Sequence, residues 1–375
     1  MIKRKIEQKI KDSLFKGKLI VLYGPRQAGK TTLAKDILKD YGDESHYVNC
    51  DEPDVSRALQ DKTSTELRAF LGNYKLVVID EAQRVRDIGL TLKLLVDTYP
   101  EMQIIATGSS SFELANKINE PLTGRKYEFF LPPLSYGELA EAEGLQATRR
   151  LLEQRMIYGM YPAIATQHSK EAETRLRELT QSYVYKDVLA LGEVRNPEVL
   201  EKLLVALALQ VGNEVSYTEL SRLVGVTKET VEKYIRILEQ AFIIFRVGPW
   251  SRNIRTELRK LRKIYFWDVG LRNMLINNLN SLELRTDKGA LWENFLIAER
   301  MKMHAGNGIS TRPYFWRTHT QQEIDYLEEV GGVLHAFEIK HKTQKWKVPA
   351  TFTAGYPDAT LTLVTRDSYE EFILE

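Results

Sequence analysis

Residues 19–31 read Leu19-Ile20-Val21-Leu22-Tyr23-Gly24-Pro25-Arg26-Gln27-Ala28-Gly29-Lys30-Thr31. From Gly24 onward they fit the pattern G-x-x-x-x-G-K-[ST] at every fixed position, and the apolar run before it is typical of a buried strand. In such a turn the backbone N–H groups converge on phosphate at the start of a helix. Lys30 adds a positive charge for the β- and γ-phosphates, and the hydroxyl of Thr31 suits Mg²⁺. A chance glycine-rich turn is the alternative, but the helical pattern after Thr31 favours a nucleoside triphosphate site.

A second apolar strand, Lys75-Leu76-Val77-Val78-Ile79, runs into the two carboxylates Asp80 and Glu81. Parallel strands present ligands at their carboxyl ends. Asp80 is therefore expected to hold the Mg²⁺ shell, and Glu81 to orient or deprotonate the attacking water. A solvated acidic pair is the other interpretation.

Two further features follow in the same region. The strand pattern 103–107 leads into Gly108-Ser109-Ser110-Ser111, where the Ser109 hydroxyl either senses the γ-phosphate or belongs to an ordinary turn. Arg125 either reaches the γ-phosphate of a neighbouring subunit or forms a surface salt bridge. The first role for Arg125 requires a ring or a dimer.

Composition narrows the class of protein. The chain has 375 residues, of which 43% are hydrophobic, and a formal charge of only +2, so any basic surface must be local. Cys50 is the single cysteine, which excludes an internal disulfide and a cysteine-based zinc site. The amino terminus lacks a secretory pattern, and the best uncharged apolar run, 203–209, is far too short to cross a bilayer. We expect a soluble cytoplasmic protein without a membrane partner.

The distribution of patterns predicts an α/β protein of several domains. Strands alternate with helical patterns up to about Phe130 and stop at Pro132-Pro133, which indicates a doubly wound parallel sheet. Residues 134–192 have a helical and charged pattern. The expected division is 1–133 for a nucleotide-binding core, 134–192 for a helical lid or linker, 193–285 for a middle domain and 286–375 for a tail domain.

The middle domain carries a helix-turn-helix pattern. Ser216 and Glu219 have capping-box spacing, Gly225 is expected to end that helix, and Thr227 is expected to cap the next one. A strand pattern follows at 241–247, so a winged helix is predicted. The second helix shows no clear excess of positive charge, whereas six of the fourteen residues 250–263 are Arg or Lys. That patch predicts phosphate contact, with a protein-docking wing as an equal alternative.

The tail domain contains a predicted hairpin with a turn at Gly331-Gly332. Counting outward from this turn places Asp325 opposite Glu338, with Lys340 on the same face and a core of Ile324, Tyr326, Phe337 and Ile339 on the other. Asp with Glu-x-Lys on one face is an arrangement that holds Mg²⁺ or Mn²⁺ and activates water against a phosphodiester. Glu293, in the helical pattern 291–296, is a candidate third carboxylate. An exposed hairpin of alternating charge is the alternative, and a one-residue bulge would invalidate the counting.

Together these residues resemble a prokaryotic group of single-chain AAA-type P-loop ATPases with a carboxy-terminal domain of unknown function. The matching segments are Gly24-Pro25-Arg26-Gln27-Ala28-Gly29-Lys30-Thr31-Thr32, Ile79-Asp80-Glu81-Ala82-Gln83, Thr107-Gly108-Ser109-Ser110, Gly124-Arg125, Tyr265-Phe266-Trp267-Asp268-Val269-Gly270-Leu271-Arg272, Tyr314-Phe315-Trp316-Arg317, Glu323-Ile324-Asp325 and Glu338-Ile339-Lys340. The resemblance implies an ATPase core, a winged-helix middle and a restriction-endonuclease-like α/β end of the PD-(D/E)xK type. In that type, Asp325, Glu338 and Lys340 are the nuclease motif and Glu293 is the helix carboxylate. One departure is that Ile324, not proline, precedes Asp325.

These observations lead to two hypotheses. The first is an ATP-dependent DNA-processing enzyme, in which an ATPase with Mg²⁺ is coupled to a nuclease that uses Mg²⁺ or Mn²⁺, with branched DNA as a conceivable substrate. The second is an ATP-switched regulator that binds DNA or protein through a non-cleaving tail. A homo-oligomer is expected, because such ATPase sites often use an arginine from a neighbour.

Overall fold

The computed structural model describes residues 2–108, 122–188, 194, 196–250, 262–318, 320–342 and 346–375, with backbone only for 185–187. These residues form two compact units. Unit 1 comprises Met1–Pro133 together with Gln240–Phe242 and Ala305–Gly308, and unit 2 comprises Leu134–Glu239, Ile243–His304 and Ile309–Glu375. Ser109 and residues 251–261 lie outside the described residues, so the predictions made for them stay predictions.

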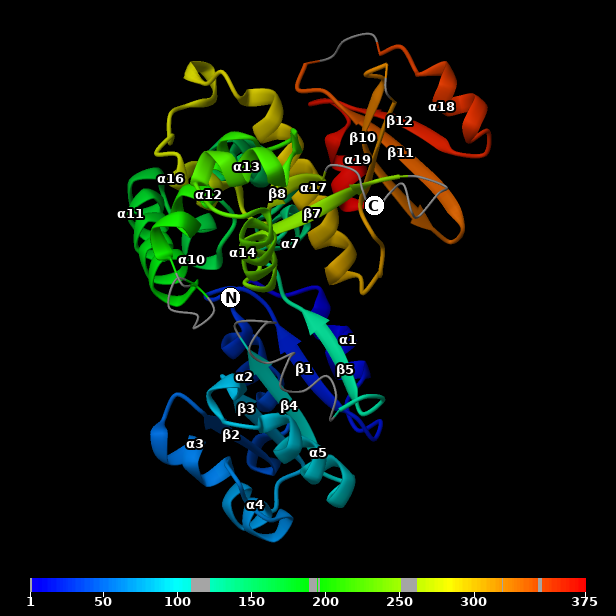
Figure 1. Cartoon of the computed structure of the whole chain (residues 1–375). Helices are drawn as coiled ribbons and strands as arrows, with labels where there is room; N and C mark the ends of the chain where they lie inside the picture. The colour runs from blue at the N-terminus through cyan, green and yellow to red at the C-terminus, as the bar shows by residue number, and fades with distance from the viewer. Residues whose placement is uncertain are drawn as a thin grey trace. The chain divides into compact units, whose positions relative to one another are not determined.

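Unit 1 contains a five-stranded sheet, and within the described residues all neighbouring strands of this sheet are parallel (Figure 1). Its strands are β1 Leu19–Tyr23, β2 Ser45–Asn49, β3 Leu76–Asp80, β4 Gln103–Gly108 and β5 Lys126–Phe130. The order across the sheet is β2-β3-β4-β1-β5. Consequently β4 separates the strand before the glycine-rich turn from the strand that ends in Asp80.

Both faces of this sheet are covered, as the predicted doubly wound arrangement requires. Within β1, Leu19 and Val21 belong to one hydrophobic core, whereas Ile20 and Leu22 belong to a second one. The helical elements of the unit are α1 Ile6–Asp12, α2 Lys30–Lys39, η1 Gly42–Glu44, α3 Pro53–Leu59, α4 Ser64–Leu71, η2 Ala82–Arg84 and α5 Ile88–Thr98. Residues of α3, α4 and α5 build the first core, and those of α1 and α2 build the second. The α/β class with a parallel sheet is confirmed.

Unit 2 begins with helices, in agreement with the pattern of its sequence. Its helical elements are α7 Tyr136–Glu143, α8 Leu145–Arg150, α9 Leu152–Tyr158, α10 Pro162–Ala165, α11 Ser169–Leu179, the π-helix η3 Thr180–Val188, α12 Pro197–Leu209, α13 Tyr217–Val224, α14 Lys228–Gln240, α16 Val269–Leu275, η4 Leu282–Leu284, α17 Lys288–Gly306, α18 Ala350–Gly355 and α19 Tyr369–Leu374. The helix pair α13 and α14 is present where it was predicted. Ser216 accepts from the Glu219 N–H, Gly225 ends α13 at φ 74°, and Thr227 accepts from the Thr230 N–H.

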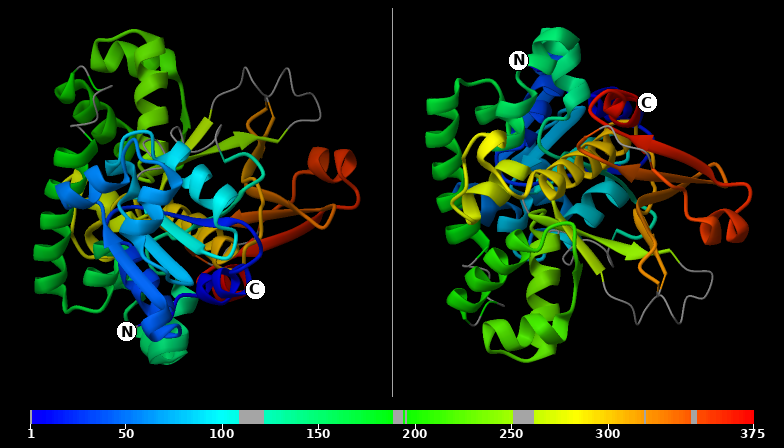
Figure 2. Two further views of the ribbon diagram at one scale, coloured as in Figure 1. Left: turned by 90° about the horizontal axis from the view of Figure 1, so that it is seen from below. Right: turned by 90° about the horizontal axis from the view of Figure 1, so that it is seen from above.

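The strands of unit 2 form one seven-stranded sheet in the order β12-β11-β10-β9-β7-β8-β6. They are β6 Glu214–Val215, β7 Ile244–Pro249, β8 Arg262–Phe266, β9 Tyr314–Arg317, β10 Glu323–Val330, β11 Val333–Ile339 and β12 Thr360–Val364. In both views of Figure 2 the orange and red strands β10–β12 extend away from the green helices of the same unit. The strands after the helix pair and those of the tail hairpin therefore share a single sheet.

The predicted hairpin has the expected turn and register. Val330 pairs with Val333 and Tyr326 with Phe337, and Gly331 and Gly332 both have positive φ, at 60° and 81°. Positive φ at both central residues is the geometry of a tight two-residue hairpin turn. The counting from this turn was therefore correct along Tyr326–Val330.

On its other edge, β10 contains an irregularity that the sequence did not reveal. Its register with β9 shifts between Ile324 and Leu327. As a result Ile324 packs in one hydrophobic cluster with Leu327, although alternation would place them on opposite faces. Tyr326 and Phe337 instead contact each other and Phe372. The prediction of one shared core for Ile324 and Tyr326 was wrong, because a bulge reverses the alternation.

The segment 265–272 has a packing role in this unit. Asp268 accepts hydrogen bonds from the Leu271 N–H at the start of α16 and from the Met160 N–H. At Gly270 a Cβ would lie 2.0 Å from the Tyr158 carbonyl oxygen, so only glycine fits there. Helix α16 is thereby held close to the end of α9.

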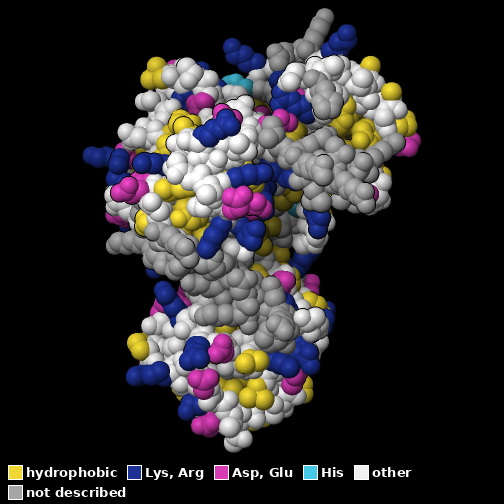
Figure 3. Space-filling model, viewed as in Figure 1, with side chains coloured by type: hydrophobic (Ala, Val, Ile, Leu, Met, Phe, Trp, Pro, Cys, Tyr) yellow, Lys and Arg dark blue, Asp and Glu magenta, His cyan; other side chains and the backbone are white. Residues whose placement is uncertain are grey.

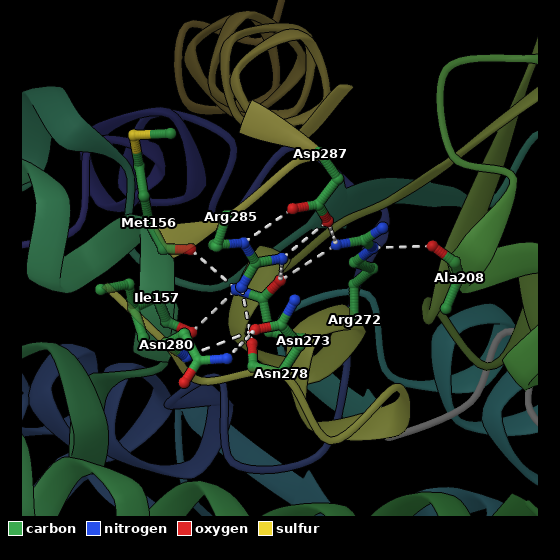
Figure 4. Close-up of polar contacts among 9 residues, drawn as sticks. All are labelled: Met156, Ile157, Ala208, Arg272, Asn273, Asn278, Asn280, Arg285 and Asp287. Carbon is green, nitrogen blue, oxygen red and sulfur yellow. Dashed lines mark hydrogen bonds and ion pairs between the residues drawn. The ribbon is translucent and has the colours of Figure 1, made fainter. Parts of the chain in front are cut away.

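A buried polar network continues from α16 (Figure 4). The guanidinium groups of Arg272 and Arg285 both donate to Asp287, and Arg272 Nε also donates to the Ala208 carbonyl at 2.7 Å. The side chain of Asn273 donates to the carbonyls of Met156 and Ile157, both at 2.9 Å. This network joins the ends of α9 and α12 to the connection that leads into α17.

Charged side chains of both signs alternate over the face drawn in Figure 3, as expected from the net charge of +2. Within the described part of the chain, every helix is too short or too polar to span a bilayer.

Candidate functional site

The glycine-rich turn, residues 24–31, connects β1 to α2 and is called the phosphate loop below. Gly24 lies close to the end of β5. A Cβ added to Gly24 would be only 2.1 Å from the Leu131 carbonyl oxygen. Gly29 precedes α2 with φ 97°, in the left-handed region that favours glycine. The loop thus delivers its backbone to the start of a ten-residue helix, where N–H groups and the helix dipole attract anions.

Lys30 is the first residue of α2, and only 5% of its surface is exposed. Its ammonium donates to the carbonyl oxygens of Gly24 and Pro25 at 2.8 and 2.9 Å. Burial lowers the pKa of Lys30 to about 8, although the carboxylates of Glu81 and Asp80 act in the opposite direction. The charge is therefore held over the loop by neutral oxygens, and phosphate oxygens would be stronger partners for it.

Asp80, at the carboxyl end of β3, is the centre of a compact hydrogen-bond group. Its Oδ2 accepts from Thr31 Oγ1 at 2.7 Å and from the Tyr47 hydroxyl at 2.6 Å, and its Oδ1 accepts from Thr107. The Glu81 N–H lies 3.2 Å from both Asp80 Oδ1 and Thr107 Oγ1. The structure therefore brings Thr31 and Asp80 together, as the predicted Mg²⁺ site requires.

Glu81 has φ 51°, a left-handed conformation that is uncommon for a residue with a side chain. Its carboxylate accepts from Gln83, which directs the side chain. A strained residue beside a phosphate loop is typical of a functional position.

Three residues at this site were not predicted, namely Arg4, Tyr47 and Thr107. Tyr47 and Thr107 lie on β2 and β4, the two strands that flank β3. Their role depends on strand order. Thr107 stands in the matching segment Thr107-Gly108-Ser109-Ser110, but no role was predicted for it. Arg4 precedes α1 and donates to the Ala28 carbonyl of the phosphate loop at 2.7 Å.

Other predicted residues lie elsewhere. Thr32 is exposed on α2. Arg125 precedes β5, and its carbonyl accepts from the Leu19 N–H at the start of β1, whereas the phosphate loop follows the other end of β1. Arg125 Nε donates to Asp97 at 2.6 Å. Within its own chain, Arg125 therefore lies at the end of the strands that is opposite to the phosphate loop.

A second polar site lies in unit 2, around Asp325 on β10 and Glu338 on β11. Lys340 Nζ is 2.5 Å from Glu338 Oε1 and 3.9 Å from Asp325 Oδ2. Asp325 also accepts from the Ile339 N–H at 2.9 Å. Asp325, Glu338 and Lys340 therefore come together as predicted.

This site also contains a lysine that the sequence did not indicate. Lys263, on β8, is only 2% exposed, and its Nζ lies 2.5 Å from Glu323, 3.3 Å from Glu293 and 3.9 Å from Asp325. Glu293, on α17, also accepts from the Tyr265 hydroxyl. The expected third carboxylate is thus present, although its nearest cation is Lys263. The carboxylate site below means Lys263, Glu293, Glu323, Asp325, Glu338 and Lys340.

The prediction of a basic surface patch at 250–263 was wrong for Lys263. Instead of facing solvent, this lysine is buried among carboxylates, because β8 is an inner strand of the sheet. A run of basic residues does not distinguish an exposed cation from one that balances buried acids.

Three carboxylates of this site, Glu293, Asp325 and Glu338, have pKa values above the usual range. Burial, followed by the effect of Asp325, raises the pKa of Glu338 to about 7. Burial also raises the pKa of Glu293 to about 7, despite the nearby Lys263, and it raises the pKa of Asp325. Crowded carboxylates of this kind favour a cation or a shared proton.

The chemistry of the donors fits a divalent cation, since Mg²⁺ and Mn²⁺ prefer carboxylate oxygens. Glu338 Oε2 is buried and has no hydrogen-bond partner, so it is a candidate ligand atom. Among the described residues, however, no three His, Cys, Asp or Glu side chains are arranged to hold a metal ion. Of the four carboxylates in the site, the pair Asp325 and Glu338 would therefore be the ligands, and Lys263 and Lys340 balance the remaining charge.

Comparison with known families divides the chain into three parts. Residues 16–140 match the family described as AAA domain. Residues 149–282 match the domain of unknown function DUF8612, and residues 288–371 match the domain of unknown function DUF4143. The phosphate loop and Asp80 lie in the AAA match, whereas the carboxylate site combines residues of the other two.

Similar proteins occur in bacteria and archaea. Over 344 residues the chain is 30% identical to the uncharacterized proteins Rv2008c of Mycobacterium tuberculosis and Mb2031c of Mycobacterium bovis, covering 90% of this chain and 74% of each relative. An uncharacterized protein of Haemophilus influenzae is 27% identical over 359 residues, covering 87% of this chain and 84% of that protein. Among solved structures, the Walker-type ATPase PABY2304 of Pyrococcus abyssi is similar, with a TM-score of 0.54 and 16% identity over 73% of this chain and 96% of that one. At this identity the likeness shows a shared fold.

Proposed function

The chain belongs to the same family as Rv2008c of Mycobacterium tuberculosis and contains an AAA-type ATPase domain, and from this premise we propose that it is an ATP-dependent DNA-processing enzyme. An ATPase fold implies nucleotide binding and usually Mg²⁺. The proposal adds that ATP hydrolysis in unit 1 is coupled to cleavage of a phosphodiester at the carboxylate site of unit 2, with branched DNA as the candidate substrate.

In unit 1 the proposed roles follow from the hydrogen bonds around Asp80. The phosphate loop and Lys30 bind the β- and γ-phosphates, and Thr31 and Asp80 support Mg²⁺. Glu81, fixed by its backbone N–H and by Gln83, orients or deprotonates the attacking water. The close group formed by Thr31, Asp80 and Thr107 supports this assignment.

In unit 2 the proposal depends on one observation. Glu338 has one oxygen bound to Lys340 and a second, buried oxygen without a partner, next to Asp325. A divalent cation would supply a Lewis acid and an activated water at such a pair. Asp325 and Glu338 would bind it, and Lys340 would stabilise the charge that develops on the scissile phosphate.

Cleavage of labelled DNA tests the proposal. The wild-type protein is incubated with linear and four-way DNA in Mg²⁺ or Mn²⁺, with and without ATP, beside Asp325→Asn and Lys30→Ala. We expect cutting that Asp325→Asn abolishes and that Lys30→Ala uncouples from ATP. Glu329→Gln, an exposed carboxylate on the same strand, is the matched control and should cut normally. Absence of cutting by the wild type under all conditions contradicts the proposal.

A second candidate is an ATP-switched regulator with a non-cleaving tail. The observation that favours it is the close pairing of Lys263 and Lys340 with the carboxylates, since these lysines already neutralise part of the negative charge that a metal ion would balance. Intact ATPase activity, together with ATP-dependent DNA or protein binding but no cutting, would establish this second function.

The proposed role of Arg125 requires a neighbouring subunit, because this residue lies away from the loop of its own chain. Mixing Arg125→Ala with Lys30→Ala tests it. In a homo-oligomer with a shared site, some mixed interfaces combine an intact loop with an intact arginine, so ATPase activity should rise above that of either variant alone. Activity equal to the average of the two variants argues against the shared site.

A further inference from the structure

Arg4 lies against the outside of the phosphate loop. It precedes α1, is 7% exposed, and directs Nη1 to the Ala28 carbonyl at 2.7 Å. A Cβ on Gly29, the next loop residue, would be 3.7 Å from the same nitrogen. The guanidinium is therefore packed against the loop just before α2 begins.

The other half of the same guanidinium holds a second segment. Nη2 donates to the Pro132 carbonyl at 2.7 Å. One residue earlier, the Leu131 N–H donates to the Tyr23 carbonyl at 2.7 Å, and the Leu131 carbonyl occupies the space beside Gly24. The start of the loop thus rests on Leu131, and its end is tied through Arg4 to Pro132.

This arrangement addresses a requirement of phosphate binding. A loop that turns its N–H groups toward phosphate turns carbonyl groups away from it, and buried carbonyls need partners. A planar guanidinium can donate to two carbonyls in fixed directions, whereas the single ammonium of lysine cannot reproduce that fork. Pro132 directly follows Leu131, whose N–H is bound to the Tyr23 carbonyl, so the Pro132 carbonyl belongs to a segment that is attached to the sheet.

We propose that Arg4 is a positioning residue of the ATP site, which fixes the Ala28 carbonyl so that the loop is already shaped for phosphate. The inference rests on the proposed role of this loop and assigns Arg4 no contact with nucleotide. Without Arg4, MgATP must first order the loop, and this cost weakens binding. The chemical step is expected to change little, because the groups around Asp80 are unaffected.

Nucleotide titration and steady-state kinetics test this role. The variants are Arg4→Ala, Arg4→Lys and the control Arg57→Ala, since Arg57 also donates to a carbonyl, that of Pro53 at 3.0 Å, but on the exposed helix α3. For Arg4→Ala we expect the Kd of a fluorescent MgATP analogue and the KM for ATP to rise roughly tenfold to hundredfold, with kcat within about threefold of wild type. Arg4→Lys should recover only part of the affinity, and Arg57→Ala should match wild type. Millimolar guanidinium should improve binding by Arg4→Ala and leave the wild type unchanged.

Each outcome has a definite meaning. Wild-type Kd and KM in Arg4→Ala would overturn the inference, as would an equal loss in Arg57→Ala or a fall in kcat alone. Should Arg4→Ala fail to fold, Arg4→Lys provides the same test, because it keeps the charge and the aliphatic stem. Failure of the wild-type protein itself to bind MgATP would instead overturn the proposed function of the loop.

Discussion

Lys30 in unit 1 and Lys263 in unit 2 are both buried lysines at candidate sites, but their partners differ. Lys30 donates to the neutral carbonyls of Gly24 and Pro25, and burial lowers its pKa to about 8. Lys263 lies within 4 Å of three carboxylates. Burial acts to lower its pKa as well, but the carboxylates of Glu293, Asp325 and Glu323 outweigh it and raise the pKa above its usual value.

The difference indicates what each lysine is for. A buried cation with neutral partners remains available to an anion, so Lys30 is suited to bind phosphate. A buried cation among acids is already neutralised, so Lys263 is suited to hold Glu293, Glu323 and Asp325 close together. Loss of Lys30 should therefore impair catalysis before stability, whereas loss of Lys263 should impair stability first.

The largest expected effect is that of Lys30→Met on ATP hydrolysis. Removing a charge that stabilises the transferred phosphoryl group should lower kcat/KM by about a thousandfold. Phosphate release measures this loss, and thermal unfolding should show a Tm no lower than that of wild type, because a costly buried charge has been removed. A marked drop in Tm would show that Lys30, like Lys263, is needed for stability, and would contradict the different roles assigned to the two lysines.

Lys263→Met should have the largest effect on folding. It leaves three carboxylates without their common cation, and breaking a buried ion pair in this way costs about 3–5 kcal/mol. Urea unfolding measures the change. Lys340→Met is the matched control, since Lys340 pairs with Glu338 but its side chain is 32% exposed, and we expect a clearly smaller cost. Equal costs would show that burial does not decide the role of these lysines.

The same two sites show how far the sequence alone could predict the structure. The phosphate loop is a local feature, because its shape depends on consecutive residues and on glycines at fixed positions. The hairpin register was also predictable, since Gly331 and Gly332 determine the turn. Local chemistry therefore predicted both the phosphate loop and the proximity of Asp325, Glu338 and Lys340.

The missing residues come from distant segments. Lys263 reaches the carboxylates from β8, and Tyr47 and Thr107 reach Asp80 from the strands beside β3. Their positions depend on the order of strands in each sheet, which no periodicity in the sequence records. For the same reason the run 250–263 predicted a basic surface, although Lys263 is buried.

The buried charges of Arg272, Arg285 and Asp287 lie outside both candidate sites, so we expect them to act on stability alone. Burial would raise the pKa of Asp287, but hydrogen bonds from Arg285 and Arg272 outweigh it and lower the pKa to about 2. A carboxylate whose folded pKa is depressed stabilises the fold above its unfolded pKa, near 3.8, and loses that contribution as the pH falls toward 2.

Asp287→Asn should therefore cost about 2 kcal/mol at neutral pH, and the difference from wild type should shrink between about pH 4 and pH 2. Unfolding by urea at a series of pH values measures it. Asp97→Asn is the control, because Asp97 pairs with Arg125 at an exposed position and its loss should cost less than about 1 kcal/mol. A difference for Asp287→Asn that does not change with pH would show that the lost stability is not electrostatic.

The smallest effects concern the caps of two helices, α4 in unit 1 and α13 in unit 2, which differ in the number of hydrogen bonds that they form. On α4, Thr63 and Glu66 form a complete capping box, with the Glu66 N–H bound to Thr63 and the Thr63 N–H bound to Glu66. On α13, the Glu219 N–H donates to the Ser216 side chain at 3.3 Å, and this single hydrogen bond forms the cap. Because two backbone donors are satisfied in the first case, Thr63→Ala should cost about 1–2 kcal/mol and Ser216→Ala about 0.5–1 kcal/mol. Hydrogen exchange of the first turns of α4 and α13 measures both changes in one experiment. A larger effect at Ser216 would mean that α13 depends on its cap more than on packing of Leu220 and Val224, its buried residues.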